Sequence, residues 1–204
     1  MIQNEEKEQE MGKIYYLMGK SASGKDTVYK RLLTECPQLK TVVLYTTRPM
    51  RDGEQDGVEY YFTTAGQLED FEKQGKLIEV RTYQTIFGPW SYGTVDDGQI
   101  DLAGNDYLVM GTLESYDKMR DYFGAEAVIP VYIRVDDGLR LIRAVNRERQ
   151  QTEPKYKELC RRFLADEEDF SAEKLKNSRI ERWFDNEDLD TCLQEVLRII
   201  QTGN

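Results

Sequence analysis

The sequence predicts an α/β protein in which a parallel β-sheet lies between two layers of helices. Short apolar runs alternate along the chain with charged segments of helical composition, which is typical of parallel sheets covered on both faces. The 204 residues, of which 39% are hydrophobic, suffice for one well-buried core with a small appended subdomain. We therefore expect one domain over residues 11–204, and we interpret the polar, acidic residues 1–10 as a disordered leader.

The first half of the chain begins with a buried strand that leads into a glycine-rich loop and a helix. Lys13 to Met18 is apolar and aromatic, whereas Asp26 to Glu35 has helical composition and stops before Pro37. A second helix is expected to start near Ala65 and to end at Gly75. Further strands are expected at residues 41–45, 59–62 and 77–82.

The second half continues the alternation of strands and helices. A buried strand is expected at residues 107–112, followed by a helix from Leu113 to about Phe123 that Gly124 ends. Val128 to Val135 is the longest strand candidate. The remaining elements are expected as helices at residues 138–149, 155–169 and 189–201, with a short strand at residues 180–184.

Charge and residue content exclude several kinds of function. A formal net charge of −10 repels polyanions, so we expect no nucleic-acid partner and look for phosphate sites in local clusters of Lys and Arg. The chain has no histidine, which excludes Ser-His triads and His-ligated zinc. Its apolar runs are too short to span a membrane, and its 3 scattered cysteines fit a reducing compartment. We therefore expect a cytoplasmic monomer or homodimer whose partners are small molecules.

The glycine-rich loop after the first strand has the spacing of a P-loop. Its glycines let successive backbone N–H groups point at a phosphate, and the following helix N-terminus adds positive potential. Lys25 then reaches the β and γ oxygens of a nucleotide, while Asp26 stands where Ser or Thr normally ligates Mg²⁺ and Thr27 follows it. The alternative is an ordinary glycine turn with Asp26 as a helix cap. The expected ATP-binding residues are Gly19, Ser21, Ala22, Ser23, Gly24, Lys25, Asp26 and Thr27, with Asp26 and Thr27 as metal ligands.

A second motif, at residues 46–62, indicates which protein family the sequence resembles. Residues 46–54 read TTRPMRDGE, and Gly57 and the segment EYYF at residues 59–62 follow. Together with the P-loop, this pattern resembles the guanylate kinase family from about Gly12 to the final helix. The resemblance implies a P-loop NTPase fold, ATP and Mg²⁺ as cofactors, and transfer of the ATP γ-phosphate to a nucleoside monophosphate, most specifically GMP to give GDP. It also implies a core at residues 11–45 and 95–204, an acceptor-binding subdomain at residues 46–94, and a helical lid at about residues 143–162.

The resemblance also implies roles for acceptor-binding residues. Arg48, Arg51 and Tyr60 would hold the acceptor phosphate, which suits guanidinium groups because they bind phosphate oxygens bidentately. Glu79 would accept the paired donors of guanine, since a carboxylate offers two acceptors. The alternatives are a solvated loop whose arginines pair with Glu54 and Asp56, and a Glu79 that pairs with Arg81. The further acceptor-binding candidates are Tyr92, Thr94 and Thr112.

The lid and the end of the chain supply the last candidates. Arg143, Arg147 and Arg162 resemble lid arginines that close over ATP, and with Lys25 the latter two are the expected catalytic residues. Most arginines of this region lie among acids, so salt-bridged helix surface is the alternative. Asn186 resembles a family asparagine at the adenine site. A helix cap by Asp188 explains the same segment equally well.

Three departures from the family pattern affect the acceptor. Leu44 replaces a serine, Thr112 replaces a carboxylate, and about four extra residues lie within the stretch from Tyr83 to Trp90. The Gly-Lys-Asp sequence of the P-loop and the strand that ends in Gly111-Thr112 resemble ribose 1,5-bisphosphate kinases. The acceptor alternatives are therefore another nucleotide or a sugar phosphate. A non-catalytic binding module of the same fold is a third alternative, against which the retained Lys25 and lid arginines argue.

Overall fold

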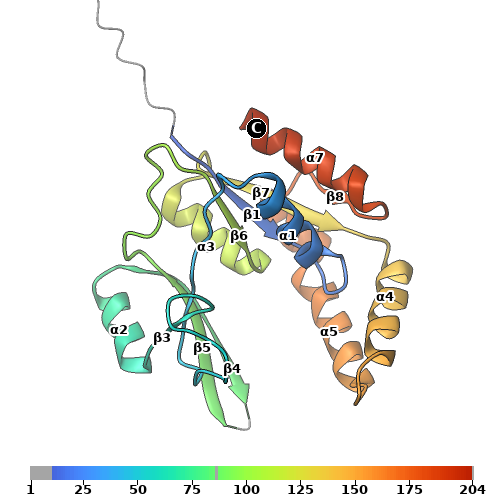
Figure 1. Cartoon of the computed structure of the whole chain (residues 1–204), viewed down its shortest axis with the longest axis horizontal. Coiled ribbons are helices and arrows are strands. Elements are labelled where there is room, and N and C mark those ends of the chain that lie inside the picture. The colour runs from blue at the N-terminus through green and yellow to red at the C-terminus, as the bar shows by residue number, and fades with distance from the viewer. Residues whose placement is uncertain (1–10, 86, 204) are drawn as a thin grey trace, which may run out of the picture.

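The protein is described by a computed structural model that covers residues 11–85 and 87–203, so the leader expected at residues 1–10 lies outside the described residues (Figure 1). Its centre is a 4-stranded sheet in the order β6-β1-β7-β8, and every neighbouring pair is parallel. This confirms the predicted parallel sheet. The strands are β1 (Ile14–Met18), β6 (Tyr107–Met110), β7 (Val128–Arg134) and β8 (Phe184–Asp185). The covering helices are α1 (Lys25–Glu35) and α7 (Leu189–Thr202) on one face and α3 (Leu113–Phe123) on the other.

The hydrophobic core has two halves because successive residues of β1 point to opposite faces of the sheet. Ile14, Tyr16 and Met18 pack into the half that contains α3. Tyr15 and Leu17 pack into the half that contains α1 and α7. All five side chains are at most 2% exposed, which explains why this strand is a continuous apolar run without polar alternation.

A second, smaller sheet lies beside the core. Its strand order is β3-β2-β5-β4, with β4 and β5 forming an antiparallel hairpin. A β-bulge at Ile78 lets Glu79 lie opposite Thr94, on the same face of the hairpin. Helix α2 (Ala65–Lys73) packs against the hairpin and begins with a capping box formed by Thr64 and Gln67. The strands are β2 (Tyr45–Thr46), β3 (Tyr61–Phe62), β4 (Leu77–Thr85) and β5 (Gly88–Val95).

A pair of helices completes the arrangement. Helices α4 (Asp137–Arg149) and α5 (Tyr156–Asp169) pack together, and the short α6 (Ala172–Asn177) follows them. Figure 1 shows that the α4–α5 pair and the β4–β5 hairpin extend from the same side of the parallel sheet, and that the loop leading into α1 lies on this side as well. The fold therefore presents three separate segments of the chain toward one region.

Several predicted boundaries were wrong. The strand expected at residues 41–45 is reduced to Tyr45–Thr46, and the strand expected at residues 180–184 to Phe184–Asp185. The strand expected at residues 59–62 covers only Tyr61–Phe62. Strand β5 and helix α6 were not predicted, and β4 extends three residues further than expected, to Thr85. Apart from α6, these elements are strands whose extent is set by pairing with β2, β3, β4, β5 or β7, and such pairing overrides weak local preference.

Candidate active site

The P-loop conformation requires its glycines. Gly24 has a φ of 87°, in the left-handed region, and a Cβ on it would overlap with the side-chain nitrogen of Asn186. A Cβ on Gly19 would lie 2.6 Å from the carbonyl oxygen of Ile133. Between them, Ala22 also has a positive φ, 63°. The loop is therefore held in a turn that side chains at either glycine would disrupt.

The residues after the turn leave polar groups without partners. Lys25 begins α1, and its ammonium group forms no ion pair with the residues that the structure describes. The hydroxyl of Ser23 is buried without a hydrogen-bond partner among them. Such groups at a helix N-terminus can bind an anion, because the N–H groups of Lys25 and Asp26 have no partner among the described residues, although Thr27 donates to Gly24.

Asp26 and Thr27 are exposed in the first turn of α1. Their oxygens are hard donors that suit Mg²⁺, which typically takes one or two protein ligands together with water and substrate phosphates. Within the described part of the chain, no group of three or more His, Cys, Asp or Glu could hold a metal by itself. The donor set thus fits a metal that arrives with a phosphate.

An ionic cluster around the buried Arg140, which the sequence did not reveal, contacts the P-loop from the α4–α5 side. Arg140 is only 1% exposed, and its guanidinium donates to Glu167 at 2.7 Å and to Asp166 and the carbonyl of Ser21 at 3.3 Å each. Asp166 in turn accepts from the backbone N–H of Ser21 at 2.8 Å. Lys20 binds Glu167 at 2.7 Å. We call Lys20, Asp137, Arg140, Asp166 and Glu167 the Arg140 cluster.

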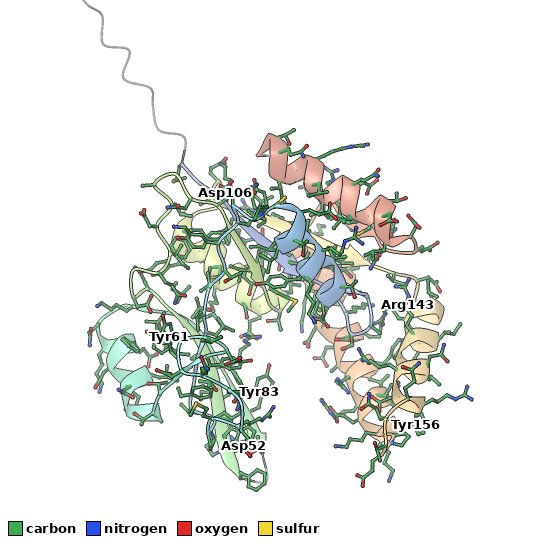
Figure 2. All side chains as sticks on the ribbon, viewed as in Figure 1. Asp52, Tyr61, Tyr83, Asp106, Arg143 and Tyr156 are labelled. Atoms are coloured by element: carbon green, nitrogen blue, oxygen red, sulfur yellow. The ribbon has the colours of Figure 1, made fainter. Side chains whose placement is uncertain are left out.

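Of the three arginines predicted to belong to a lid, Arg143 contacts the P-loop region through Asn186. Its guanidinium donates to the carbonyl of Asn186 at 3.0 Å, and the Asn186 amide donates to the carbonyl of Ser23 at 2.8 Å. Figure 2 shows Arg143 on the part of the helical pair nearer the sheet and Tyr156 at its far tip. Asp188 caps α7 by accepting from Thr191, so the cap and the Asn186 contact coexist.

The other two lid arginines are less constrained. Arg147 is exposed on α4 and forms no ion pair with the described residues. Arg162 lies 3.5 Å from Glu158 and 3.9 Å from Glu148, and its Nε is buried without a hydrogen-bond partner among the described residues. Arg147 is therefore available to a further anion, whereas Arg162 would have to exchange Glu148 or Glu158 for one, and the assigned roles of both arginines stay predictions.

On the second sheet, Arg48 forms the centre of an aromatic and ionic group. Its side chain is 3% exposed and binds both oxygens of Glu54, at 2.8 and 2.9 Å. It also lies over the ring of Tyr60 at 5.3 Å, and that ring packs edge-on against Tyr92. Hydrogen bonds, first from Arg48 and then from the backbone of Arg51, lower the pKa of Glu54 to about 2. The pairing with Glu54 that was the alternative to a phosphate-binding role thus occurs for Arg48, although Arg48 is buried and not solvated, whereas Arg51 is exposed.

Glu79 lies at the meeting point of the hairpin and α3, with 7% exposure. Thr94 donates to its Oε1 at 2.9 Å, and Arg81 and Ser115 donate to its Oε2 at 3.1 and 3.2 Å. Thr112 caps α3 and lies 3.0 Å from the Ser115 hydroxyl. Three sequence-predicted residues from different elements are thus brought together, and Ser115 joins them although no motif marked it.

The structure also places Gly111, Leu44 and the hairpin that contains the extra residues. The Tyr16 hydroxyl lies directly against Gly111, where a Cβ would overlap with it. Burial, and next the charge of Glu79, raise the pKa of this phenol. Leu44 precedes β2 and contributes only its carbonyl, which accepts from Tyr61. The extra residues between Tyr83 and Trp90 extend the β4–β5 hairpin.

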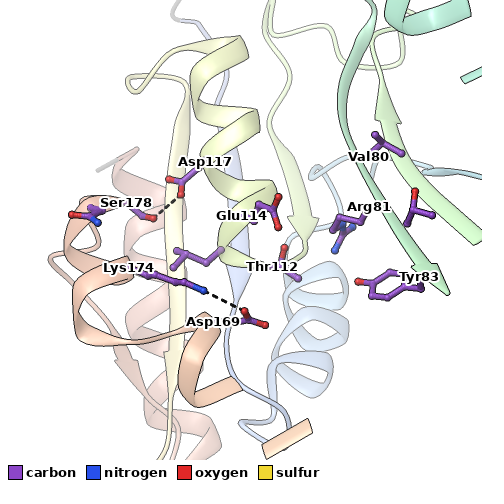
Figure 3. Close-up of a pocket in the computed structure, with 12 residues that line it drawn as sticks. Val80, Arg81, Tyr83, Thr112, Glu114, Asp117, Asp169, Lys174 and Ser178 are labelled. Atoms are coloured by element: carbon purple, nitrogen blue, oxygen red, sulfur yellow. Dashed lines mark hydrogen bonds and ion pairs between the residues drawn. The ribbon is translucent and has the colours of Figure 1, made fainter. Parts of the chain in front are cut away.

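A pocket of about 640 Å³ is lined by Arg81, which pairs with Glu79, and by Thr112, which contacts Ser115. It lies between β4, the start of α3 and the segment around α6 (Figure 3). Arg81 and Tyr83 line one side and Thr112 and Glu114 the other, and Lys174 faces them from α6. This volume suits a small-molecule ligand.

Comparisons with known proteins agree with this geometry. The guanylate kinase family model matches residues 11–202. A guanylate kinase of Chlorobaculum tepidum is 31% identical over 175 residues, which covers 85% of this chain and 77% of the relative. Those of Neisseria gonorrhoeae and Granulibacter bethesdensis are each 36% identical, over 48% and 53% of this chain. The chain spans about half the length of these two relatives, 46% and 50%.

The fold is also found among solved structures. The crystal structure of guanylate kinase from Anaplasma phagocytophilum matches with a TM-score of 0.59 and 23% identity, over 95% of this chain and 86% of that one. This likeness supports the P-loop NTPase fold that the parallel sheet and the loop before α1 form. With the family model matching almost from end to end, the chain belongs to the guanylate kinase family.

Proposed function

We propose that this protein transfers the γ-phosphate of ATP to a nucleoside monophosphate, with GMP as the acceptor and GDP as the product. One observation carries the proposal: a glycine loop with an unpaired lysine and a sheet with a buried arginine–tyrosine group extend toward the same region. Phosphoryl transfer needs these two parts, because it depends on positioning and on charge neutralisation. The names of the relatives support GMP as the acceptor.

The donor side would bind ATP through the loop from Gly19 to Thr27. Its backbone N–H groups and Lys25 would hold the β- and γ-phosphates, and the unpartnered hydroxyl of Ser23 would gain a partner. Asp26 and Thr27 would hold a magnesium ion that arrives with the nucleotide and supplies neutralisation of the phosphate charge. The carboxylate of Asp26 adds negative charge there, so Lys25 carries more of the neutralisation.

The acceptor side would hold the monophosphate in line with the donor. Arg48, Arg51, Tyr60 and Tyr92 would bind the phosphate, and the Glu79 region would contact the base. A phosphate oxygen of the acceptor is already largely ionised at neutral pH, so it needs no strong general base. This accords with a chain that has no histidine.

The domain assignment belongs to the same proposal. The acceptor subdomain comprises residues 46–94 and the lid about residues 143–162, with the remainder of residues 11–204 as the core. The exposure of Arg147, which forms no ion pair with the described residues, supports a lid that brings a cation to the transferring phosphate, and Arg162 would join it by leaving Glu148 and Glu158. Closure would also exclude water and so limit hydrolysis of ATP.

The cellular setting is also part of the proposal. The 3 cysteines are free thiols, which supports a reducing compartment such as the cytoplasm. Among the described helices, none is both long and apolar enough to cross a membrane. A monomer or homodimer is expected, and light scattering at working concentration distinguishes the two.

An ADP-release assay tests the proposed reaction. GMP, dGMP, AMP, UMP, CMP and ribose 1,5-bisphosphate are compared as acceptors, with GMP expected to turn over fastest. Lys25→Ala should abolish turnover without unfolding the protein, whereas Lys30→Ala, an exposed lysine of the same helix, should not. Turnover with the bisphosphate alone would reject GMP but keep the ATP site. Failure of ATP to raise the melting temperature would reject the enzyme in favour of a binding module.

A further inference from the structure

The carboxylate of Glu79 has little capacity left for a ligand. Each carboxylate oxygen accepts about two hydrogen bonds. Oε2 already accepts from Arg81 at 3.1 Å and Ser115 at 3.2 Å, while Oε1 accepts from Thr94 at 2.9 Å. The side chain is 4% exposed, so water does not compete for it. One position on Oε1 therefore remains.

Guanine presents two adjacent donors, N1–H and the 2-amino group, and a carboxylate binds both only with one free position on each oxygen. Either Arg81 or Ser115 must then leave Oε2. Ser115 is 1% exposed within α3, so its side chain cannot move away from Oε2. Its hydroxyl proton can turn toward Thr112, but the hydroxyl oxygen then still occupies the space beside Oε2. The Arg81 side chain is 18% exposed at the pocket, so it is the group that guanine must displace.

Arg81 also gives the pocket donors of its own. Only its Nε is engaged by a described residue, which leaves the N–H groups of both terminal nitrogens. Figure 3 shows the side chain extending from β4 on the side of the pocket that faces Thr112. A guanidinium in this place favours oxygen acceptors on the base.

We propose that Arg81 is a specificity-determining residue that lowers the preference of the acceptor site for guanine over a 2-oxo purine. It occupies the carboxylate that the 2-amino group of guanine needs, and it offers N–H donors to an oxygen at the same position. The inference rests on the proposed function, because it concerns the acceptor of that reaction. It extends the acceptor class from GMP to purine monophosphates with a carbonyl at position 2.

The test compares GMP with xanthosine monophosphate as acceptors. Arg81→Met removes the guanidinium but keeps the aliphatic stem, and Arg31→Met on α1 removes an arginine that is likewise paired with a glutamate. Arg81→Met should raise the ratio of kcat/KM for GMP to that for xanthosine monophosphate by about tenfold, mainly through KM for GMP. Arg81→Lys, which keeps a cation within reach of Glu79, should retain most of the wild-type ratio.

Three results would overturn the inference. The ratio of kcat/KM for GMP to that for xanthosine monophosphate could stay within twofold of the wild-type value in Arg81→Met. The ratio could rise equally in Arg31→Met, or it could rise in Arg81→Lys as much as in Arg81→Met. If Arg81→Met does not fold, titration calorimetry measures the affinities of the wild-type protein for GMP and for xanthosine monophosphate. An affinity for GMP more than about a thousandfold above that for xanthosine monophosphate would contradict the role of Arg81, and a smaller difference would support it. Turnover of GMP with an unchanged ratio rejects this inference alone. If ATP binds but no monophosphate is phosphorylated, the proposed function fails and this inference fails with it.

Discussion

Replacing Arg140 should lower the free energy of unfolding by an amount that can be worked out from the contacts of the Arg140 cluster. Arg140→Met removes a 1%-exposed guanidinium that contacts Asp137, Asp166 and Glu167 and stacks on Phe163 at 4.6 Å. Removing one partner of a fully buried ion pair costs about 3–5 kcal/mol, because the other charge stays buried. Here Asp137 and Glu167 are 50% and 40% exposed, so water compensates in part. We expect a loss of about 2–3 kcal/mol.

Urea unfolding measures this loss, with Arg161→Met as the matched control. Arg161 pairs with Glu158 on the same helical pair but is 65% exposed, so its removal should leave the unfolding midpoint almost unchanged. Because Arg140 and Asp166 also hold Ser21, Arg140→Met should weaken ATP binding beyond the stability effect. A loss below about 1 kcal/mol together with unchanged ATP affinity would refute the idea that the cluster supports the P-loop.

Three further predictions concern the turn, the acceptor loop and a helix cap. Gly24→Ala forces a left-handed alanine against Asn186, and should cost about 2–4 kcal/mol by urea unfolding and reduce ATP affinity; an unchanged unfolding midpoint would contradict the turn geometry. The pKa of Glu54 is lowered from 4.5 to about 2, so the stability that its charge contributes is full above pH 4.5 and is lost as the pH falls toward 2. Glu54→Gln should therefore flatten the curve of unfolding free energy against pH in this range. A curve parallel to that of the wild type would argue against the pairing with Arg48. Thr64→Ala removes the capping box of α2 and should lower the free energy of unfolding in urea by about 1 kcal/mol; an unchanged midpoint would contradict a stabilising cap.

The sequence predicted those parts of the fold whose signal is local. Strand β1 is a continuous apolar run followed by a glycine loop, and both strand and loop lie where they were expected. Strand β5 was missed because the segment from Gly88 to Val95 contains Pro89 and two glycines and has no clear alternation. It becomes a strand through pairing with β4, in a register that places Pro89 opposite Gln84. Such pairing is a tertiary effect that local preference does not encode.

The candidate site also contains residues that a local sequence pattern marks and residues that only the fold brings to it. The P-loop spacing made Gly24 a candidate, and the resemblance to the guanylate kinase family made Arg48 and Glu79 candidates, because each belongs to a short sequence pattern. Arg140 and Ser115 carry no such pattern. Arg140 meets Glu167 across 27 residues of sequence, and Ser115 meets Glu79 across 36. Their importance follows only from what the fold places beside them.

The two lysines of the P-loop show how an acidic protein keeps a site for anions. Lys20 lies 2.7 Å from Glu167 and 3.7 Å from Asp137, so its charge is largely neutralised by the protein itself. Lys25 has no carboxylate within ion-pair distance among the described residues, so its charge remains available to a phosphate. The acids of the Arg140 cluster therefore hold Lys20 and Arg140 in contact with the loop and leave Lys25 free. Substituting Lys20 should consequently shift the loop and raise KM for ATP, whereas substituting Lys25 should remove the charge that the transferred phosphate requires.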